Sequence, residues 1–462
     1  MIRLFRVFVP TSVIALILSE VALLIAVFIL ATVLIIPTDP VIYLVYEGGF
    51  TKIFLVVSSV LLGLYFQDMY ADLHIRSRIV LFQQLSFVVG LTFFFQALLT
   101  YINPSLMMSR WVMIFASAVL LLAMPLWRMA FTGVVWKAIG GDRILFVGTN
   151  NDALDIARRI TERPDLGLSC VGFLDNARPK GEQLDGGEVL GGISCLRDVV
   201  ANVRPNRIIV GMSERRQALP VYDLLDLRFS GIRIEEAATL FESAFGRVST
   251  RDLRPSQLIF TAELGPQPHN LQLQSIYSTV LAFIGLVILS PVMLLVALAV
   301  RFTSPGPILF RQTRAGMNGR PFTLYKFRSM RTDAEAQTGA VWAKRNDPRV
   351  TPIGKYLRSY RLDELPQLWN VLKGEMSIVG PRPERPEFVR TLQEKIPFYR
   401  QRHSVRPGIT GWAQINYKYG ETLEDAIIKL EFDLYYIKNL SPSLDLYIIL
   451  NTFKVMLGQL GH

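Results

Sequence analysis

The chain has 462 residues, of which 51% are hydrophobic and 19% are charged. It is too apolar for an ordinary soluble globular protein and too charged for a protein that lies wholly within a membrane. The composition therefore predicts a mosaic of membrane segments and polar domains. The net charge is +11, and residues 301–462 hold 25 of the 49 lysines and arginines but only 15 of the 38 acidic residues. Two cysteines and four histidines disfavour a disulfide framework, a structural zinc site and a histidine-based metal site.

Four long apolar runs in the N-terminal third are predicted to be transmembrane helices. They cover residues 12–36, 53–66, 79–102 and 111–127, and about 20 apolar residues suffice to cross a hydrocarbon core of ~30 Å. The basic residues that flank these runs are Arg3, Arg6, Arg76, Arg78, Lys137 and Arg143, whereas the loop with Asp39 and Glu47 has none. Both ends of the four-helix unit are therefore expected in the cytoplasm. Glu20, inside the first run, is predicted to be functional or paired with another helix.

A fifth apolar segment, residues 276–300, differs from the others because Ser290-Pro291 lies inside it. Proline removes a backbone donor and clashes with the preceding turn, so such a break survives in lipid only where other groups satisfy the backbone. The segment is either a kinked spanning helix or a hairpin that enters the membrane and returns to the same face. A spanning helix would place the basic C-terminal domain outside, away from cytoplasmic nucleotides.

Between the fourth run and the fifth, short apolar strands alternate with helical spacing. Residues 143–147, 169–174 and 207–210 are predicted strands and residues 153–160 a helix, which is typical of βαβ units with a parallel sheet. The turn that begins at Gly148 has one glycine where a dinucleotide-binding fingerprint needs three. Asp175 follows the second strand and could meet a ribose. The sequence leaves nucleotide binding open beside a structural, assembly or regulatory role.

The C-terminal third begins with a cluster of positive charge. Its first cations are Arg311, Arg314, Arg320, Lys326, Arg328 and Arg331. A basic surface beside a membrane can simply attract anionic headgroups, at roughly 1 kcal/mol per Lys or Arg. The other interpretation is a site for phosphorylated substrates, some of them dissolved in the bilayer.

An acidic pair within residues 357–383 favours the second interpretation. Leu362, Leu365, Leu368, Trp369 and Leu372 recur at helical spacing. Pro366 fits only the first turn of a helix, so Asp363 and Glu364 are predicted to lie at a helix N-terminus. An acidic residue there is often only an N-cap. Two adjacent carboxylates beside cations suit another task, in which one attacks phosphorus and the other holds a magnesium ion. The rigid loop 380–383 (GPRP) presents Arg382, whose guanidinium is shaped to grip phosphate.

From about residue 276 onward, the sequence resembles the catalytic domain of the bacterial sugar transferases, the monotopic polyprenyl-phosphate phosphoglycosyl transferases. The motifs that carry the resemblance are Ser290-Pro291, SPGPILFRQTRAG, YKFRSM, NDPRVTPIGKYLRS, LDELPQLWNVLKGEMSIVGPRP, VRPGITGWAQIN and EFDLYYIKNLSPSLD. Many relatives open the membrane helix with Lys-Arg and an Asp three residues later, whereas this chain has Gln-Leu-Gln-Ser-Ile-Tyr at 272–277.

The resemblance implies a mixed membrane protein of the large branch that initiates exopolysaccharide synthesis. Residues 1–135 are then an N-terminal four-helix transmembrane bundle, residues 136–265 a Rossmann-like α/β middle domain, and residues 266–462 an α-rich catalytic domain. Residues 276–300 become a Pro-broken re-entrant helix, because both substrates must meet at the cytoplasmic face. We expect a homodimer in the bacterial inner (cytoplasmic) membrane, with the catalytic domain in the cytoplasm.

The resemblance also implies the reaction. A nucleotide-diphosphate sugar, expected to be a UDP-sugar, donates its sugar 1-phosphate to undecaprenyl phosphate and releases UMP, as the first membrane step of exopolysaccharide, capsule or O-antigen synthesis. Asp363 is the implied nucleophile that forms a covalent phosphosugar intermediate. Glu364 is the implied principal ligand of Mg²⁺ or Mn²⁺, with Asp363 beside it. The implied substrate- and phosphate-binding residues are Lys326, Arg358, Arg382 and Asp445, and the implied hinge is Ser290 and Pro291.

Three other functions were weighed. A membrane-tethered nucleotide-sugar epimerase or dehydratase needs a Tyr-x-x-x-Lys pair, and no tyrosine of this chain has a lysine four residues on. A non-catalytic scaffold or regulator of polysaccharide assembly stays open, although the acidic pair argues against it. Nucleic-acid binding is not expected, because the basic residues are interleaved with apolar ones and no known module is present. Nothing in the sequence distinguishes which sugar is transferred.

Overall fold

The computed structural model describes residues 2–4, 7–9, 11–37, 39–67, 69–70, 78–131, 142–163, 167–212, 219–251, 265–332, 334, 349–417 and 422–457. The chain divides into two compact units. The first comprises residues 1–2, 9–149 and 154–235, and the second residues 3–8, 150–153 and 236–462. The acidic pair lies in the second unit, whose longest stretch begins at Glu236, and the predicted boundary at residue 266 stays a prediction.

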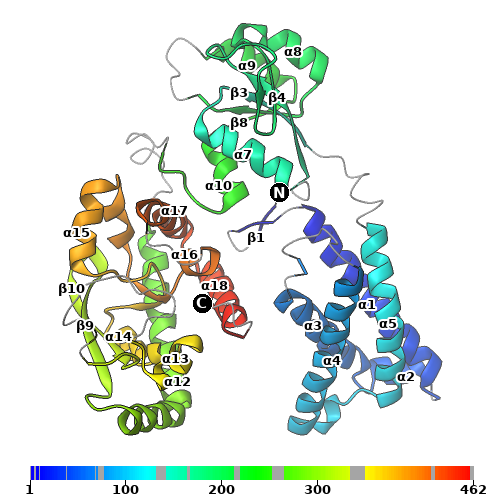
Figure 1. The fold of residues 1–462 in the computed structure, drawn as a ribbon. Coiled ribbons are helices and arrows are strands. Elements are labelled where there is room, and N and C mark those ends of the chain that lie inside the picture. Colours follow the sequence, from blue (N-terminus) through cyan, green and yellow to red (C-terminus); the bar gives the residue numbers. More distant parts are fainter. Residues whose placement is uncertain are drawn as a thin grey trace. The chain divides into compact units, whose positions relative to one another are not determined.

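Among the residues that the structure describes, five helices are long and apolar enough to cross a membrane. Four of them match the predicted spans: α1 (Thr11–Ile35), α3 (Gly49–Phe66), α4 (Arg78–Ile102) and α5 (Arg110–Ala130). The short helix α2 (Pro40–Val45) lies between the first two in the chain. The four long helices bury a common apolar cluster that includes Leu24, Val56, Leu85 and Val112 (Figure 1). The four predicted helices are thus present, and their orientation across a membrane stays a prediction.

Glu20 is buried in the middle of α1, where it pairs with other segments. Arg128 of α5 donates from Nε to Glu20 Oε1 at 2.6 Å, and the Tyr70 hydroxyl donates to Glu20 Oε2 at 2.7 Å. An unpaired carboxylate among apolar helices would carry a large desolvation cost, which these donors offset. The predicted pairing of Glu20 with another helix is confirmed.

The middle of the chain forms a six-stranded sheet in the order β5-β6-β4-β3-β7-β8. The strands are β3 (Asp142–Val147), β4 (Leu168–Leu174), β5 (Gln183–Leu184), β6 (Gly187–Gly191), β7 (Arg207–Val210) and β8 (Arg233–Glu236). β3 pairs in parallel with β4 and β7, and β4 pairs in parallel with β6. β5 pairs antiparallel with β6, so the sheet is mixed. The predicted parallel pairing is confirmed for β3, β4 and β7, the three strands named from the sequence.

Helices cover both faces of this sheet (Figure 1). They are α7 (Asn151–Glu162), α8 (Leu196–Val203) and α9 (Val221–Phe229). The turn after β3 needs its glycine, because Gly148 has φ +94° and a Cβ there would lie 2.4 Å from the Gly211 carbonyl. Both Asp175 carboxylate oxygens accept local bonds, one from the Thr149 hydroxyl and one from the Ala177 N–H. Asp175 thus braces the turn, and nucleotide binding there stays untested.

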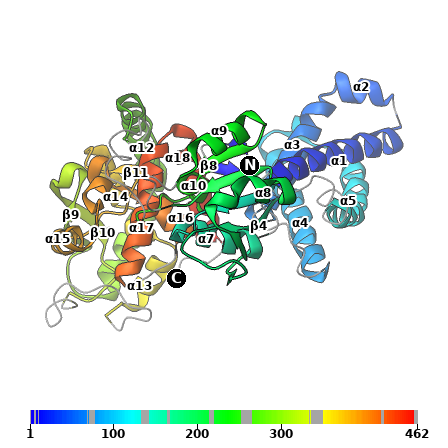
Figure 2. The same ribbon diagram turned by 90° about the horizontal axis from the view of Figure 1, so that it is seen from above.

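The second unit surrounds one antiparallel hairpin, β9 (Leu309–Ala315) with β10 (Pro321–Phe327). Its helices are α10 (Ala237–Phe245), α12 (Pro268–Thr303), α13 (Pro352–Ser359), α14 (Gln367–Leu372), α15 (Pro386–Lys395), α16 (Trp412–Asn416), α17 (Leu423–Asn439) and α18 (Pro442–Leu457). β11 (Ser377–Val379) pairs in parallel with β12 (Gly408–Thr410). Figure 2 shows the hairpin flanked by α14 and α15.

Helix α10 joins this unit because polar contacts attach it and the turn that follows to the catalytic core. Lys438 of α17 lies 2.7 Å from the Glu242 carboxylate, and the Trp412 indole N–H donates to the Gly246 carbonyl at 2.7 Å. Nothing in the sequence around Glu242 and Gly246 indicated that α10 belongs to the C-terminal domain. This packing explains why the longest stretch of the second unit begins at Glu236.

The Pro-containing segment forms one continuous helix, α12. Its backbone is helical from Pro268 to Thr303 without interruption across Ser290 and Pro291, so the predicted break is corrected to a bend. Figure 1 shows the two arms of α12 running in different directions. Pro291 cannot donate to the Val287 carbonyl, and the Ser290 hydroxyl donates to that carbonyl instead, at 2.8 Å. A serine immediately before the proline thereby satisfies the backbone group that the proline frees.

Candidate active site

Asp363 and Glu364 lie on a single 3₁₀ turn, η6 (Leu362–Glu364), between α13 and α14. The long predicted helix is thus split into this turn and the six-residue α14, which Pro366 precedes as the N-cap residue. Arg361 introduces the turn with φ +52°, a left-handed conformation that is costly for a residue with a Cβ. The predicted position of the acidic pair just ahead of a helix start is confirmed.

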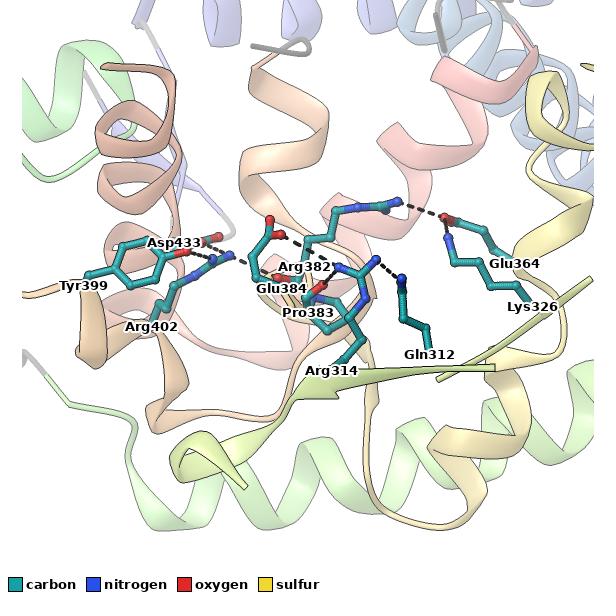
Figure 3. A network of polar contacts seen from close by, with 10 residues as sticks. All are labelled: Gln312, Arg314, Lys326, Glu364, Arg382, Pro383, Glu384, Tyr399, Arg402 and Asp433. Atoms are coloured by element: carbon teal, nitrogen blue, oxygen red, sulfur yellow. Dashed lines mark hydrogen bonds and ion pairs between the residues drawn. The ribbon is translucent and has the colours of Figure 1, made fainter. Parts of the chain in front are cut away.

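Two cations from separate parts of the fold meet at Glu364 (Figure 3). Lys326 Nζ on β10 lies 2.7 Å from Glu364 Oε1, and Arg382 Nη2 lies 3.2 Å from the same oxygen. Asn370 of α14 sets the register of these elements, because it accepts from the Tyr325 N–H at 3.2 Å and donates to the Thr323 carbonyl at 2.7 Å. Packing of α14 on β10 therefore delivers Lys326 to the acidic pair.

The two neighbouring carboxylates have opposite electrostatic environments. Asp363 and Glu364 are only 6% and 7% exposed. Burial raises the pKa of Asp363 above its usual value, and the adjacent Glu364 charge acts in the same direction against the cations. Burial also acts to raise the pKa of Glu364, but the charges of Lys326 and Arg382 outweigh it and hold that pKa well below the usual range. Glu364 is therefore a permanent anion, whereas Asp363 is a carboxylate of raised basicity.

The acidic pair opens onto a cavity of about 1220 Å³. Among the described residues that line it, twelve are cationic and three are acidic. The cations are Arg311, Arg314, Lys326, Arg328, Arg331, Arg349, Arg358, Arg361, Arg382, Arg385, Arg402 and Lys429. Arg358 lies on α13, and its charge lowers the pKa of Asp363. Such an excess of positive charge suits a ligand with several phosphate charges.

The loop that carries Arg382 is held by close backbone approach. A Cβ on Gly380 would lie 2.4 Å from the Arg406 carbonyl oxygen, so only glycine fits between β11 and β12. The Gly380 N–H donates to the Thr410 carbonyl at 2.9 Å, and the Gly408 N–H donates to the Pro381 carbonyl at 3.0 Å. The small parallel pair of strands therefore fixes the base of the GPRP loop.

Comparison with known proteins agrees with this architecture. The family model described as bacterial sugar transferase matches residues 269–459, and one described as CoA-binding domain matches residues 65–225. The UDP-N-acetylgalactosamine-undecaprenyl-phosphate N-acetylgalactosaminephosphotransferase of Aeromonas hydrophila is 44% identical over 220 residues, or 48% of this chain and 51% of that protein. The UDP-glucose:undecaprenyl-phosphate glucose-1-phosphate transferase of Xanthomonas campestris pv. campestris is 35% identical over 331 residues, or 70% of this chain and 68% of that protein. The chain belongs to the bacterial sugar transferase family.

The relative of the same name in Escherichia coli (strain K12) is 38% identical over 306 residues, or 65% of this chain and 64% of that protein. The chain thus spans about half the length of the Aeromonas relative and about two thirds of the other two. The family is an enzyme family of membrane proteins, in line with the apolar helices. The predicted family resemblance is confirmed. The evidence for the site residues of this sugar transferase is the geometry of its own cavity.

Five of the predicted site residues come together, and three do not. Lys326, Arg358, Asp363, Glu364 and Arg382 all line the cavity. Asp445 lies outside the described lining of the cavity, and its role in the substrate site stays a prediction. Its buried carboxylate accepts from Gln274 Nε2 at 2.7 Å and from the hydroxyls of Tyr277 and Tyr436. Ser290 and Pro291 lie in the bend of α12. In this sugar transferase, Asp445 anchors α12 to α18 at the segment where many relatives carry Lys-Arg.

Sequence reasoning missed a second set of polar residues, buried or half-buried, close to the loop of Arg382 (Figure 3). They are Gln312, Arg314, Glu384, Tyr399, Arg402 and Asp433. Arg314 had been noted only as one of several cations, and Arg402 and Asp433 had not been singled out. Their one sequence signal is position, because Arg402 precedes the VRPGITG motif and Asp433 lies within EFDLYY. Charged residues in such motifs are candidates for burial in pairs.

Proposed function

We propose that this protein transfers the sugar 1-phosphate of a UDP-sugar to undecaprenyl phosphate, with release of UMP, as the first membrane step of a polysaccharide pathway. The observation that carries the proposal is the buried pair of Asp363 and Glu364 at the edge of a cavity rich in cations. The names of the three relatives describe this class of reaction and these substrates. The cavity is large enough for a drug-sized ligand with several charges.

Asp363 is the nucleophile in this proposal. One of its carboxylate oxygens attacks the phosphorus that bears the sugar, the bond to the bridging oxygen breaks, and UMP leaves with the bond electrons. The phosphate oxygen of undecaprenyl phosphate then attacks the same phosphorus and releases the Asp363 carboxylate. The raised pKa of Asp363 fits this role because a more basic carboxylate is the better nucleophile. Glu364, whose pKa is held low by Lys326 and Arg382, is the weaker nucleophile of the two.

Lys326, Arg358 and Arg382 bind the phosphates in this proposal. Arg382 is 38% exposed in its side chain, so it can turn from Glu364 towards a ligand while its backbone stays fixed. Guanidinium groups pair with two phosphate oxygens at once, whereas the Lys326 ammonium supplies a compact charge. Together they stabilise the charge that develops on the leaving phosphate.

The residues present fit a magnesium or manganese ion. In the described part of the chain, no group of three or more His, Cys, Asp and Glu side chains forms a complete metal cage. Mg²⁺ is usually held by one or two carboxylates together with substrate phosphates, which is the donor set that Glu364 and Asp363 would provide. When bound, the ion would neutralise phosphate charge and orient the diphosphate.

Helix α12 supports a re-entrant arrangement in the inner membrane, with the catalytic domain in the cytoplasm. Its apolar side chains are exposed along both arms, including Ile276, Phe283, Ile288, Leu295 and Phe302. The arms diverge at the Ser290-Pro291 bend, and the cation-rich cavity lies on the same unit. A helix that returned to the cytoplasmic face would keep the cavity beside the UDP-sugar. The homodimer stays a prediction.

The topology is tested by cysteine labelling in cells after Cys170 and Cys195 are replaced by serine. Arg320→Cys, on the exposed turn between β9 and β10, is expected to react only after the inner membrane is permeabilised. Tyr46→Cys, in the loop between α2 and α3, is the matched control and is expected to react from the periplasm. Labelling of Arg320→Cys in intact spheroplasts would instead establish a spanning α12.

The reaction is tested with the full-length protein in lipid nanodiscs that contain undecaprenyl phosphate. UDP-glucose, UDP-galactose, UDP-N-acetylglucosamine and UDP-N-acetylgalactosamine are supplied separately, and UMP release is measured. At least one donor is expected to give UMP in proportion to lipid-linked sugar. Without undecaprenyl phosphate, UMP release is expected to stop at one equivalent per enzyme. Failure of all four donors, with intact fold, would favour a non-catalytic scaffold.

A further inference from the structure

A buried ion pair lies behind the loop that presents Arg382. Arg402, on the 3₁₀ segment η7 (Tyr399–Ser404), is 7% exposed, and its Nη2 lies 2.9 Å from an oxygen of Asp433 on α17. Arg402 Nη1 also donates to the Tyr399 hydroxyl at 2.6 Å. Burying a guanidinium and a carboxylate costs several kcal/mol per ion before their attraction is counted, and such pairs are often no more stabilising than apolar residues. Stability alone is therefore a weak explanation of this pair.

The pair has a direct link to the phosphate-binding loop. Arg402 Nη2 donates to the carbonyl oxygen of Arg382 at 3.1 Å. The next carbonyl, that of Pro383, accepts from Arg314 Nη1 at 3.0 Å. Figure 3 shows the Arg402 guanidinium on one side of the loop, beside Tyr399 and Asp433, and the Arg382 side chain extending in the other direction to Glu364.

The backbone of the loop is consequently bonded at each of its four residues. Gly380 donates to β12 and Pro381 accepts from it, while the carbonyls of Arg382 and Pro383 accept from buried arginines. The two prolines fix φ at their own positions. Of these bonds, the one from Arg402 acts on Arg382 itself. The Arg382 side chain can thus move at the cavity while the backbone of the loop stays in place.

We propose that Arg402, with Asp433 as its counter-ion, is a positioning residue that fixes the backbone of Arg382 so that the Arg382 guanidinium meets the donor diphosphate. This inference rests on the proposed function. Arg402 acts through Arg382 and does not touch Glu364. Misplacement of a substrate-holding group by about 1 Å can lower the rate by roughly 100-fold. The buried pair prevents such a shift of Arg382.

The first test is the variant Arg402→Lys, which keeps the charge but cannot bond Asp433, Tyr399 and the Arg382 carbonyl at once. We expect kcat/KM for the UDP-sugar to fall by about 10- to 100-fold, chiefly through KM, while KM for undecaprenyl phosphate changes little. Asp433→Asn, which keeps the side-chain shape and removes the counter-charge, is expected to change the same constants in the same direction. It serves as the second variant if Arg402→Lys does not fold.

The decisive test is a double-mutant cycle with Arg382→Lys. If Arg402 acts through Arg382, adding Arg402→Lys to Arg382→Lys lowers kcat/KM by less than about twofold, because the guanidinium to be positioned is already gone. Equal fold losses in both backgrounds would overturn the proposal while leaving the proposed function intact. Absence of UMP release by the unmodified protein would instead overturn the proposed function.

Arg247→Lys is the matched control. Arg247 lies 3.2 Å from Glu431, so it forms another partly buried ion pair with α17, two residues from Asp433, and it has no contact with the loop. This variant is expected to lower Tm without changing kcat/KM for the UDP-sugar. If Arg247→Lys and Arg402→Lys change kcat/KM alike, the Arg402 pair is only structural and the proposal fails.

Discussion

Asp363→Asn is expected to abolish sugar-phosphate transfer while the protein still folds and inserts. The amide cannot attack phosphorus, so no covalent phosphosugar forms, and turnover should fall by at least about 1,000-fold, as when other enzymes lose a nucleophile. The measurements are UMP release and trapping of radiolabelled phosphosugar on the protein after quenching with denaturant. Near-normal turnover of Asp363→Asn would contradict the nucleophile role.

Folding of Asp363→Asn should be preserved for an electrostatic reason. Burial raises the pKa of Asp363, which means that the folded protein holds the ionised form at a cost relative to the unfolded chain. The neutral amide of the same shape removes that cost, so Tm above neutral pH is expected to stay equal or rise. The control is Glu394→Gln on α15, an exposed residue that does not line the cavity, which should leave both turnover and Tm unchanged.

Removal of divalent metal is expected to have the second-largest effect. In excess chelator, UMP release should fall by at least about 100-fold, because the carboxylates and cations alone would leave diphosphate charge unneutralised. Added Mg²⁺ or Mn²⁺ should restore the rate. Full activity in excess chelator would remove Glu364 and Asp363 from the proposed metal-binding role.

The variant Glu364→Gln separates metal binding from general damage to the site. It keeps the size of the side chain but loses the charge that holds Lys326 and Arg382, and it should shift the Mg²⁺ concentration for half-maximal rate upward by at least about tenfold. Lys373→Gln is the control, because Lys373 lies outside the described lining of the cavity. It should leave the Mg²⁺ requirement unchanged. An unchanged requirement in Glu364→Gln would place the ion elsewhere.

Features that depend on nearby residues could be predicted from the sequence. The apolar runs gave the four N-terminal helices because length and hydropathy are properties of a contiguous segment. The strands β3, β4 and β7 were found because each is a short apolar run bounded by polar turns. Pro366 located the helix start beside the acidic pair for a similarly local reason.

Other local patterns were insufficient. Ser290-Pro291 predicted a break, but whether a proline interrupts a helix depends on which group takes up the freed carbonyl, and the Ser290 hydroxyl does so. The place of α10 in the second compact unit could not be predicted, because it rests on contacts such as that of Glu242 with Lys438. The partners of Asp445 on α12 could not be predicted either, since Gln274 and Tyr277 are remote from it in sequence.

The sequence by itself determined the family, the membrane helices, the parallel strands and the acidic pair, because motifs and periodicities are carried by neighbouring residues. The resemblance implied that Lys326 and Arg382 bind phosphate, but the tertiary structure alone decided that both meet at Glu364 and that Arg402 holds the backbone of Arg382. Lys326 and Arg382 lie 38 and 18 positions from Glu364, and Arg402 reaches Arg382 across 20. Such pairings depend on how β10, η7 and α17 pack, and packing is a property of the whole fold.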